Sequence, residues 1–228
     1  MTTIVGIVAG KGDKGVILAS DLTGTQEFWE TKGDVAFRER IKQESQKIYV
    51  DESRNLAVST VGLIDQEYNA LLSRILRGEI DIKVAMEKGF LPEIVQLHLD
   101  RFDRKIWQDG GTTSLLVASR YEDTPQLYSV FPLGKVEPRH YTAVGSGSSH
   151  ALGYMAKQKF LSNEDITLKD AVRIATGALE AASSSDLYTG GLDIAVIKPK
   201  GIVQVGEIIR ESIEQARQDS LNRILEKI

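Results

Sequence analysis

Short apolar runs joined by glycine-rich turns are the feature of this sequence that most restricts its possible folds. The first run, Thr3–Ala9, is dense in valine and isoleucine and too short for a buried helix, so it predicts a strand. A turn containing three glycines follows at residues 10–15, and a second apolar run covers residues 16–20. Together these segments predict a β-hairpin, because glycine supplies the backbone angles that tight turns require.

The order of the later segments predicts the fold class. Further strands are expected at residues 47–50, 56–61, 113–118, 126–131, 140–144, 192–197 and 201–205. Apolar residues at helical spacing predict helices at residues 64–78, 92–107, 148–160 and 168–182, and from Glu207 onward. Hairpin-linked strands interrupted by helix pairs indicate an α+β fold, a four-layer αββα sandwich of two antiparallel sheets flanked by helices.

Residues 26–43 do not fit this alternation. The segment is polar and charged, with Trp29 and Phe37 embedded in it, and we interpret it as a long loop or excursion from the sheets. No repeat, low-complexity tract or linker divides the rest of the chain. We therefore expect one domain over residues 1–228, with an insertion at about 26–43.

Composition excludes several classes of function. The chain has no cysteine, which rules out disulfide scaffolds, thiolate metal sites and cysteine nucleophiles. Its three histidines, His98, His140 and His150, are scattered without the spacing of a zinc site, so we expect no metal and no cofactor. A net charge of −4 gives no basic surface for nucleic acid.

The sequence also lacks the features of a membrane or secreted protein. No apolar run approaches the ~18 residues that a bilayer-spanning helix needs. The N-terminus has no basic region before its first apolar run, so we expect no signal peptide. A cytoplasmic protein without a membrane partner is the expectation.

Thr2 is the first candidate catalytic residue in the chain. Methionine before a small residue is commonly removed, and removal of Met1 would leave a free α-amine on Thr2. Such an amine has a pKa of about 7.7–8.0, so it can act as a general base near neutral pH and activate the hydroxyl of its own residue. A chain that begins Met-Thr-Thr is ordinary, however, and an N-terminal polar residue without function is the alternative.

Six segments along the chain resemble proteasome β-type subunits, and they occur in that family's order. They are the opening hairpin at residues 2–7 and 15–21, the lysine-bearing strand 46–49, the strand 59–62 ending in glycine, the Gly-Ser-Gly loop 144–148, and the Asp-x-x-Thr-Gly-Gly turn 186–191. Each motif alone is weak, and each has an ordinary structural explanation as a turn, a cap or a solvated lysine. The ordered set covers nearly the whole chain and carries the resemblance.

The resemblance implies a role for each matching position. Thr2 would be the nucleophile, Lys47 would lie beside it and influence its protonation, and Asp21 would pair with Lys47. The backbone N–H of Gly62 would donate to the oxyanion of the tetrahedral intermediate. Three further residues would hold the N-terminus in place: Ser146, Asp186 and Thr189.

The same resemblance implies a substrate that lies extended beside Thr25 and Gly62, bound along its main chain. The pocket for the residue before the scissile bond would be shaped by Gly24, Ser45, Thr60 and Ile64. Thr60 and Ile64 favour a medium-sized and largely apolar pocket without a dedicated charge.

The implied activity is that of a threonine endopeptidase enclosed in a ring-shaped chamber. Its partners would be peptide or unfolded-protein substrates, like subunits in a homo-oligomeric ring, and an α-type ring or an ATP-driven unfoldase. Two alternatives stay open: an N-terminal-nucleophile amidase or transpeptidase with a dedicated substrate, and a non-catalytic ring subunit that retains Met1.

Three departures from the family pattern indicate a divergent member. Thr189 stands where serine is usual, Thr23 stands where many members carry a positively charged residue, and the segment between Thr25 and Lys47 is longer than is common. Only Met1 precedes Thr2, so we expect no propeptide.

Overall fold

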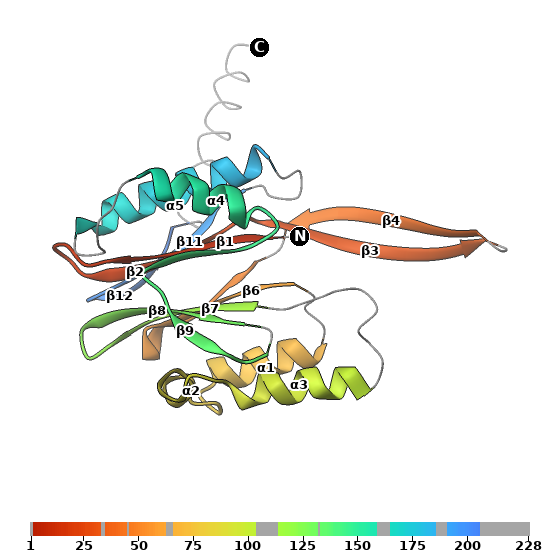
Figure 1. The fold of residues 1–228 in the computed structure, drawn as a ribbon, viewed down its shortest axis with the longest axis horizontal. Helices are drawn as coiled ribbons and strands as arrows, with labels where there is room; N and C mark the ends of the chain where they lie inside the picture. The colour runs from red at the N-terminus through yellow and green to blue at the C-terminus, as the bar shows by residue number, and fades with distance from the viewer. Residues whose placement is uncertain are drawn as a thin grey trace, which may run out of the picture.

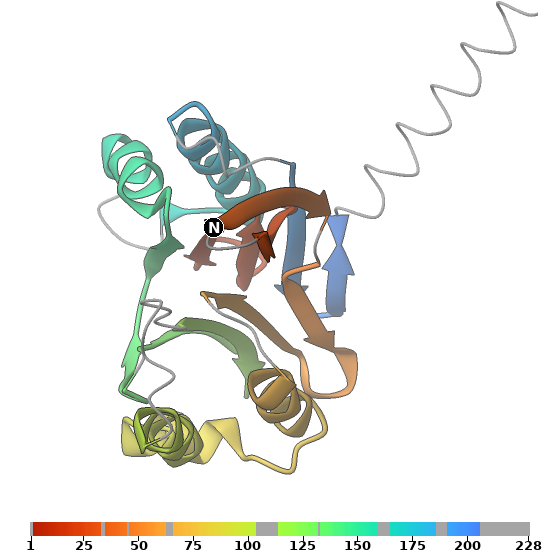
Figure 2. The same cartoon turned by 90° about the vertical axis from the view of Figure 1, so that its right-hand side faces the viewer.

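Two five-stranded antiparallel sheets pack face to face, and helices cover their outer faces (Figure 1). The structure is a computed structural model that describes residues 2–32, 35–44, 46–62, 66–103, 114–131, 133–158, 165–185 and 191–205. The four layers confirm the predicted αββα sandwich. Figure 2 shows the same layers along the sheets, with one group of helices on each outer face.

The first sheet has the strand order β10-β1-β2-β11-β12. Its strands are β1 (Thr3–Ala9), β2 (Gly15–Ser20), β10 (Tyr141–Gly145), β11 (Asp193–Lys198) and β12 (Gly201–Gln204). Helices α4 (Ser148–Lys157) and α5 (Leu168–Ser183) lie side by side on its outer face (Figure 2). The predicted opening hairpin is confirmed, since β1 pairs with β2 from Ile4↔Ser20 to Ala9↔Gly15.

The second sheet has the order β5-β6-β7-β8-β9. Its strands are β5 (Ile48–Asp51), β6 (Leu56–Val61), β7 (Ser114–Tyr121), β8 (Thr124–Val130) and β9 (Val136–Pro138). A 3-10 turn, η1 (Glu52–Arg54), joins β5 to β6. Its outer face carries α1 (Gln66–Leu76), α2 (Ile82–Lys88) and α3 (Pro92–Asp103).

Strand alternation divides the apolar residues into three buried layers. In β1, Ile4 and Val8 belong to the layer between the sheets, whereas Val5 and Ile7 belong to the layer under α4 and α5. This follows from the period of two, which sends neighbouring side chains to opposite faces. Because both of its faces are covered, the strands β1, β2 and β11 in the middle of the first sheet are nearly continuous apolar runs.

Local sequence signals set several helix boundaries. The hydroxyl of Thr167 accepts a hydrogen bond from the backbone N–H of Asp170 and caps the start of α5. Gly78, expected to end the first helix, has a φ of +76° two residues after α1 ends, and its N–H donates to the carbonyl of Ile75.

The interpretation of residues 26–43 as a loop is wrong. They belong to a two-stranded antiparallel ribbon of β3 (Thr23–Lys32) and β4 (Val35–Glu44), which projects away from the sandwich (Figure 1). The strands pair from Thr23↔Glu44 to Lys32↔Val35. Polar composition concealed this ribbon, because backbone pairing requires strand-compatible residues and not an apolar face buried by the same chain.

Two short elements also differ from the expectation of helix pairs. The seven-residue α2 is a third helix before β7, and the three-residue β9 follows β8. The ends of the predicted helices 92–107 and 148–160, and the helix predicted from Glu207, lie partly or wholly outside the described residues. Among the helices that are described, none is both long and apolar enough to cross a membrane.

Substitution of Leu116 tests the layer between the sheets. Leu116 is fully buried there, so Leu116→Ala removes apolar contacts and leaves a cavity. We expect the free energy of unfolding to fall by about 2–5 kcal/mol in urea denaturation followed by circular dichroism. Leu133→Ala is the matched control, because the side chain of Leu133 is 71% exposed. Equal losses in both variants would contradict this packing.

Candidate active site

A buried ion pair joins the two sheets at one edge of the sandwich. Nζ of Lys47 lies 2.7 Å from Oδ2 of Asp21, and the two residues are 3% and 0% exposed. Asp21 directly follows β2 of the first sheet, and Lys47 directly precedes β5 of the second sheet. The pair therefore ties together chain segments that the intervening ribbon separates in sequence.

The ribbon explains why Asp21 and Lys47 meet. β3 begins two residues after Asp21, and β4 ends three residues before Lys47. The pairing Thr23↔Glu44 holds the two ends of the ribbon side by side, whatever the length of the ribbon beyond them. A ribbon of this form lengthens the connection without separating the charged partners.

The carboxylate of Asp21 accepts hydrogen bonds from three donors. Its Oδ1 accepts the backbone N–H of Thr3 at 2.8 Å, and its Oδ2 accepts the N–H of Thr23 at 3.1 Å as well as the ammonium of Lys47. Lys47 also donates to the carbonyl of Thr23 at 2.6 Å, and the N–H of Asp21 donates to the carbonyl of Thr3 at 3.1 Å. This network fixes the start of β1, the root of the ribbon and the lysine nitrogen relative to one another.

Burial perturbs both members of the pair. Desolvation raises the pKa of Asp21 above its ordinary value, and the nearby Lys47 charge and the hydrogen bonds from Lys47, Thr3 and Thr23 act against this. Desolvation also lowers the pKa of Lys47, against the opposing charge and hydrogen bond of Asp21. The Lys47 nitrogen therefore releases its proton more readily than the nitrogen of a solvated lysine.

A glycine-rich loop after β10 holds the first residues of the chain. The N–H of Ser146 donates to the carbonyl of Thr2 at 3.0 Å, and the N–H of Gly147 donates to the hydroxyl of Thr3 at 3.1 Å. Gly145 has a φ of +105°, and a Cβ at this position would lie 1.7 Å from the Thr2 carbonyl oxygen. Only glycine fits this close approach, so the loop sequence is matched to the path of the N-terminus.

The end of β6 lies at the same edge of the second sheet as Lys47. β5 and β6 are antiparallel, with Ile48 opposite Ser59, and the Ser59 hydroxyl donates to the carbonyl of Lys47 at 2.8 Å. Gly62 directly follows β6, is exposed and has a φ of +110°. Thr60 is 1% exposed, and its hydroxyl has no hydrogen-bond partner within the described part of the chain.

Known proteins are similar to this sequence over most of its length. The sequence model of the proteasome subunit family matches residues 90–197. Proteasome subunit beta 2 of Aeropyrum pernix is 31% identical over 208 residues, which cover 88% of this chain and 83% of that protein. The chain belongs to the proteasome β-subunit family.

Two further relatives match to a similar extent. Proteasome subunit beta 2 of Ignicoccus hospitalis is 29% identical over 223 residues, or 92% of each chain. Proteasome subunit beta of Haloferax volcanii is 29% identical over 204 residues, or 88% of this chain and 75% of that protein. The resemblance of this β-type subunit to the family, first indicated by short motifs, is therefore confirmed.

The structure of this β-type subunit brings together four of the residues that the resemblance implied. Thr2, Asp21, Lys47 and Ser146 are connected through the network at the start of β1, and Gly62 lies at the edge that Lys47 occupies. Gly24 and Thr25 lie in β3, next to the root of the ribbon, and Thr60 lies in β6. Four predicted residues lie outside the described residues: Ser45, Ile64, Asp186 and Thr189.

Three residues of the network carried no predicted role. Thr3, Thr23 and Gly147 contribute mainly backbone N–H and carbonyl groups, which every residue possesses and which leave no mark in the sequence. The hydroxyl of Thr3 is the exception. A threonine at the start of an otherwise apolar buried strand was the available signal, since a buried hydroxyl needs a partner.

Removal of the Asp21 charge tests the ion pair. The three side-chain contacts of Asp21 are all donors, so the amide of Asp21→Asn must turn its NH₂ group toward one of them, and it leaves Lys47 buried without a counter-charge. We expect a loss of about 3–5 kcal/mol in the free energy of unfolding. The double variant Asp21→Asn/Lys47→Met should recover part of this loss, because it has no unpaired buried charge.

The same variants predict a pH dependence. In Asp21→Asn, burial holds the folded-state pKa of Lys47 below its ordinary value of 10.5. A group with a depressed pKa adds stability as pH rises from its folded-state value to its unfolded-state value. The stability of Asp21→Asn should therefore rise with pH below about 10.5. Urea denaturation across that range should show no such rise for the double variant. Parallel pH profiles would contradict the prediction.

Proposed function

We propose that this chain is a threonine-type endopeptidase subunit of a self-compartmentalising proteasome-like particle, with Thr2 as its nucleophile once Met1 is removed. The observation that supports this best is the shared carboxylate of Asp21, which binds both the Lys47 ammonium and the N–H of the peptide bond after Thr2. The Asp21 carboxylate therefore links the peptide bond between Thr2 and Thr3 to the buried Lys47 nitrogen through two hydrogen bonds.

In the proposed reaction, the free α-amine of Thr2 removes the proton from the Thr2 hydroxyl, directly or through a water. The hydroxyl oxygen attacks the peptide carbonyl, and the N–H of Gly62 donates to the oxyanion that forms. The amine then returns the proton to the leaving amino group, and water hydrolyses the ester on Thr2. An amide nitrogen cannot accept the proton, so the mechanism requires removal of Met1.

Lys47 contributes electrostatically in this scheme. Its positive charge lowers the pKa of a neighbouring amine and stabilises an alkoxide, and both effects favour the reactive form of Thr2. Asp21 keeps the lysine nitrogen in place. Ser146 holds the Thr2 carbonyl, and Asp186 and Thr189 would complete the support of the N-terminus in the proposal.

The proposed substrate is an unfolded polypeptide bound as an extended strand. Thr25, at the root of β3, would supply backbone partners on one side, and Gly62 on the other. Gly24 would lie in the specificity pocket. Thr60, with Ser45 and Ile64, would shape a medium-sized apolar specificity pocket. A panel of fluorogenic peptides should therefore show faster cleavage after apolar residues than after basic ones, and the opposite preference would refute this pocket.

The proposed assembly is a cytoplasmic homo-oligomeric ring that encloses the active sites. Its further partners would be an α-type ring or an ATP-driven unfoldase that delivers unfolded chains. Enclosure suits a peptidase of low specificity, because exposed loops of folded proteins would otherwise be cut.

Substitution of Thr2 is the central test. Thr2→Ala removes the hydroxyl and keeps the amine, so peptide hydrolysis should fall by at least about 1,000-fold. Thr2→Ser should retain measurable activity because it keeps a nucleophilic hydroxyl. Thr124→Ala is the control, since Thr124 is exposed at the start of β8, at the far end of the second sheet.

The intact mass of each protein is measured in parallel. A mass without Met1 together with an inactive Thr2→Ala variant supports the proposal, and equal activity of wild type and Thr2→Ala refutes it. Retention of Met1 in an inactive assembled ring would instead identify a non-catalytic ring subunit. Hydrolysis of small amides without cleavage of denatured casein would identify an amidase.

A further inference from the structure

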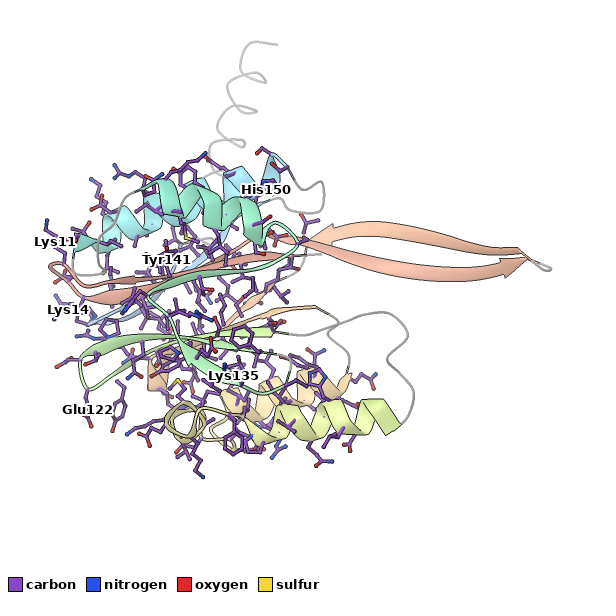
Figure 3. The ribbon with its side chains drawn as sticks, in the orientation of Figure 1. Lys11, Lys14, Glu122, Lys135, Tyr141 and His150 are labelled. Atoms are coloured by element: carbon purple, nitrogen blue, oxygen red, sulfur yellow. The ribbon has the colours of Figure 1, made fainter. Side chains whose placement is uncertain are left out.

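A cavity of about 320 Å³ lies between α2 and the second sheet, away from the candidate active site. β6 begins at this cavity with Leu56 and ends at Val61, and the antiparallel β7 ends here with Tyr121. The Asp21–Lys47 pair lies at the other end of these strands. Glu122, next to Tyr121, marks the cavity end in Figure 3, opposite to the β3–β4 ribbon.

The floor of the cavity contains a buried hydroxyl. Ser119 lines the cavity and is 7% exposed, and its Oγ has no hydrogen-bond partner among the described residues. Ser119 pairs with Leu56 across the strands and follows Val117 by two residues, and both of these belong to the apolar layer beneath α1–α3. The hydroxyl therefore faces α2. Because buried hydroxyls are rarely left unpaired in native proteins, this one indicates a partner that the chain does not supply.

The walls of the cavity are mainly apolar. Leu56, Ile82 and Met86 contribute side chains from β6 and α2. Methionine adapts its shape readily, which allows a small cavity to close around a ligand. A volume of about 320 Å³ lies at the lower end of the range for small-molecule sites, so the site suits a compact ligand such as a substituted aromatic ring.

Most polar groups around the cavity are already engaged. The guanidinium of Arg54 donates to Asp51 and to the carbonyls of Ile75 and Leu76 at the end of α1. Arg120 pairs with Asp123 through Nη2, whereas its buried Nε has no hydrogen-bond partner among the described residues. Asp81 accepts hydrogen bonds from two backbone N–H groups at the start of α2.

Of the cations that line the cavity, Lys83 has the longest contact with a carboxylate. Its Nζ lies 3.6 Å from the ring centre of Tyr121, and its contact with Glu87 is long, at 3.8 Å, between two exposed side chains. Such an exposed ion pair contributes little to stability, so the Lys83 ammonium can bind a better placed anion.

We propose that this cavity binds a small organic monocarboxylate with an apolar body. Lys83 binds the carboxylate at the mouth, Ser119 donates its hydroxyl hydrogen to an acceptor atom of the ligand, and Leu56, Ile82 and Met86 enclose the apolar part. The site is separate from the residues proposed to cut peptides, and its occupancy does not depend on removal of Met1.

Phenylacetate is a suitable probe, and isothermal titration calorimetry of the full-length assembled protein gives a readout independent of peptidase activity. We expect saturable binding with one site per chain. Ser119→Ala should weaken it roughly three- to tenfold and Lys83→Gln roughly tenfold, as expected for the loss of a neutral and a charge-assisted hydrogen bond. Phenylacetamide, which has nearly the same shape and no charge, should also bind roughly tenfold more weakly.

Two matched variants separate the site from general effects. Ser129→Ala removes another buried, unpaired hydroxyl outside the cavity, and Lys88→Gln removes another cation of α2 that does not line it. Both should bind phenylacetate like wild type. Met86→Trp, which fills the cavity from the helix side, should abolish binding even if Ser119→Ala does not fold.

Four results of these binding measurements would contradict the proposal. Absence of saturable binding, unchanged affinity in Met86→Trp, or equal affinity for phenylacetate and phenylacetamide would each overturn the proposal. Weaker binding in Lys88→Gln to the same degree as in Lys83→Gln would also overturn it, because the effect would then come from the net charge of α2.

Discussion

The carboxylate of Asp21 is the interaction on which the arrangement of this molecule depends. It follows a strand of one sheet, binds a lysine that precedes a strand of the other, and accepts the first strand N–H of the chain. Moving a carboxylate out of water costs several kcal/mol, and this cost is offset only while its donors keep their positions. The N-terminus, the two sheets and the root of the ribbon are therefore fixed by one group. A site that needs its reacting atoms held to a fraction of an ångström benefits from such mutual dependence.

Much of the fold could be predicted because its signals are local. The apolar runs are strands because both faces of each sheet are buried, and Thr167 begins a helix because its hydroxyl satisfies a free N–H. Short elements were missed because they are too brief to show a period. α2 has seven residues, and its only signals were Asp81 before it and Gly89 after it, which cap its two ends. The β3–β4 ribbon was missed for another reason, since its polar composition is also that of a loop.

Less of the candidate active site than of the fold could be predicted from residue chemistry alone. Chemistry alone indicated only that a threonine near the N-terminus can be activated by its own amine, and the resemblance to proteasome β subunits supplied the partners Asp21, Lys47 and Ser146. Sequence could not reveal that the Thr23 carbonyl and the N–H groups of Thr3 and Gly147 join this network, because backbone groups are common to all residues. It also could not reveal the unpaired Ser119 hydroxyl, which depends on what a neighbouring strand and helix leave uncovered.

The ribbon has a mechanical consequence. Its first residue, Thr23, donates to the carboxylate of Asp21 through its N–H and accepts the ammonium of Lys47 through its carbonyl. A two-stranded ribbon transmits bending to its base as a lever does, since pairing along its length resists shear between the strands. Thr23 therefore couples the base of the ribbon directly to both charged groups. In this subunit, the ribbon that projects from the sandwich begins at a residue bonded to both charged groups (Figure 1).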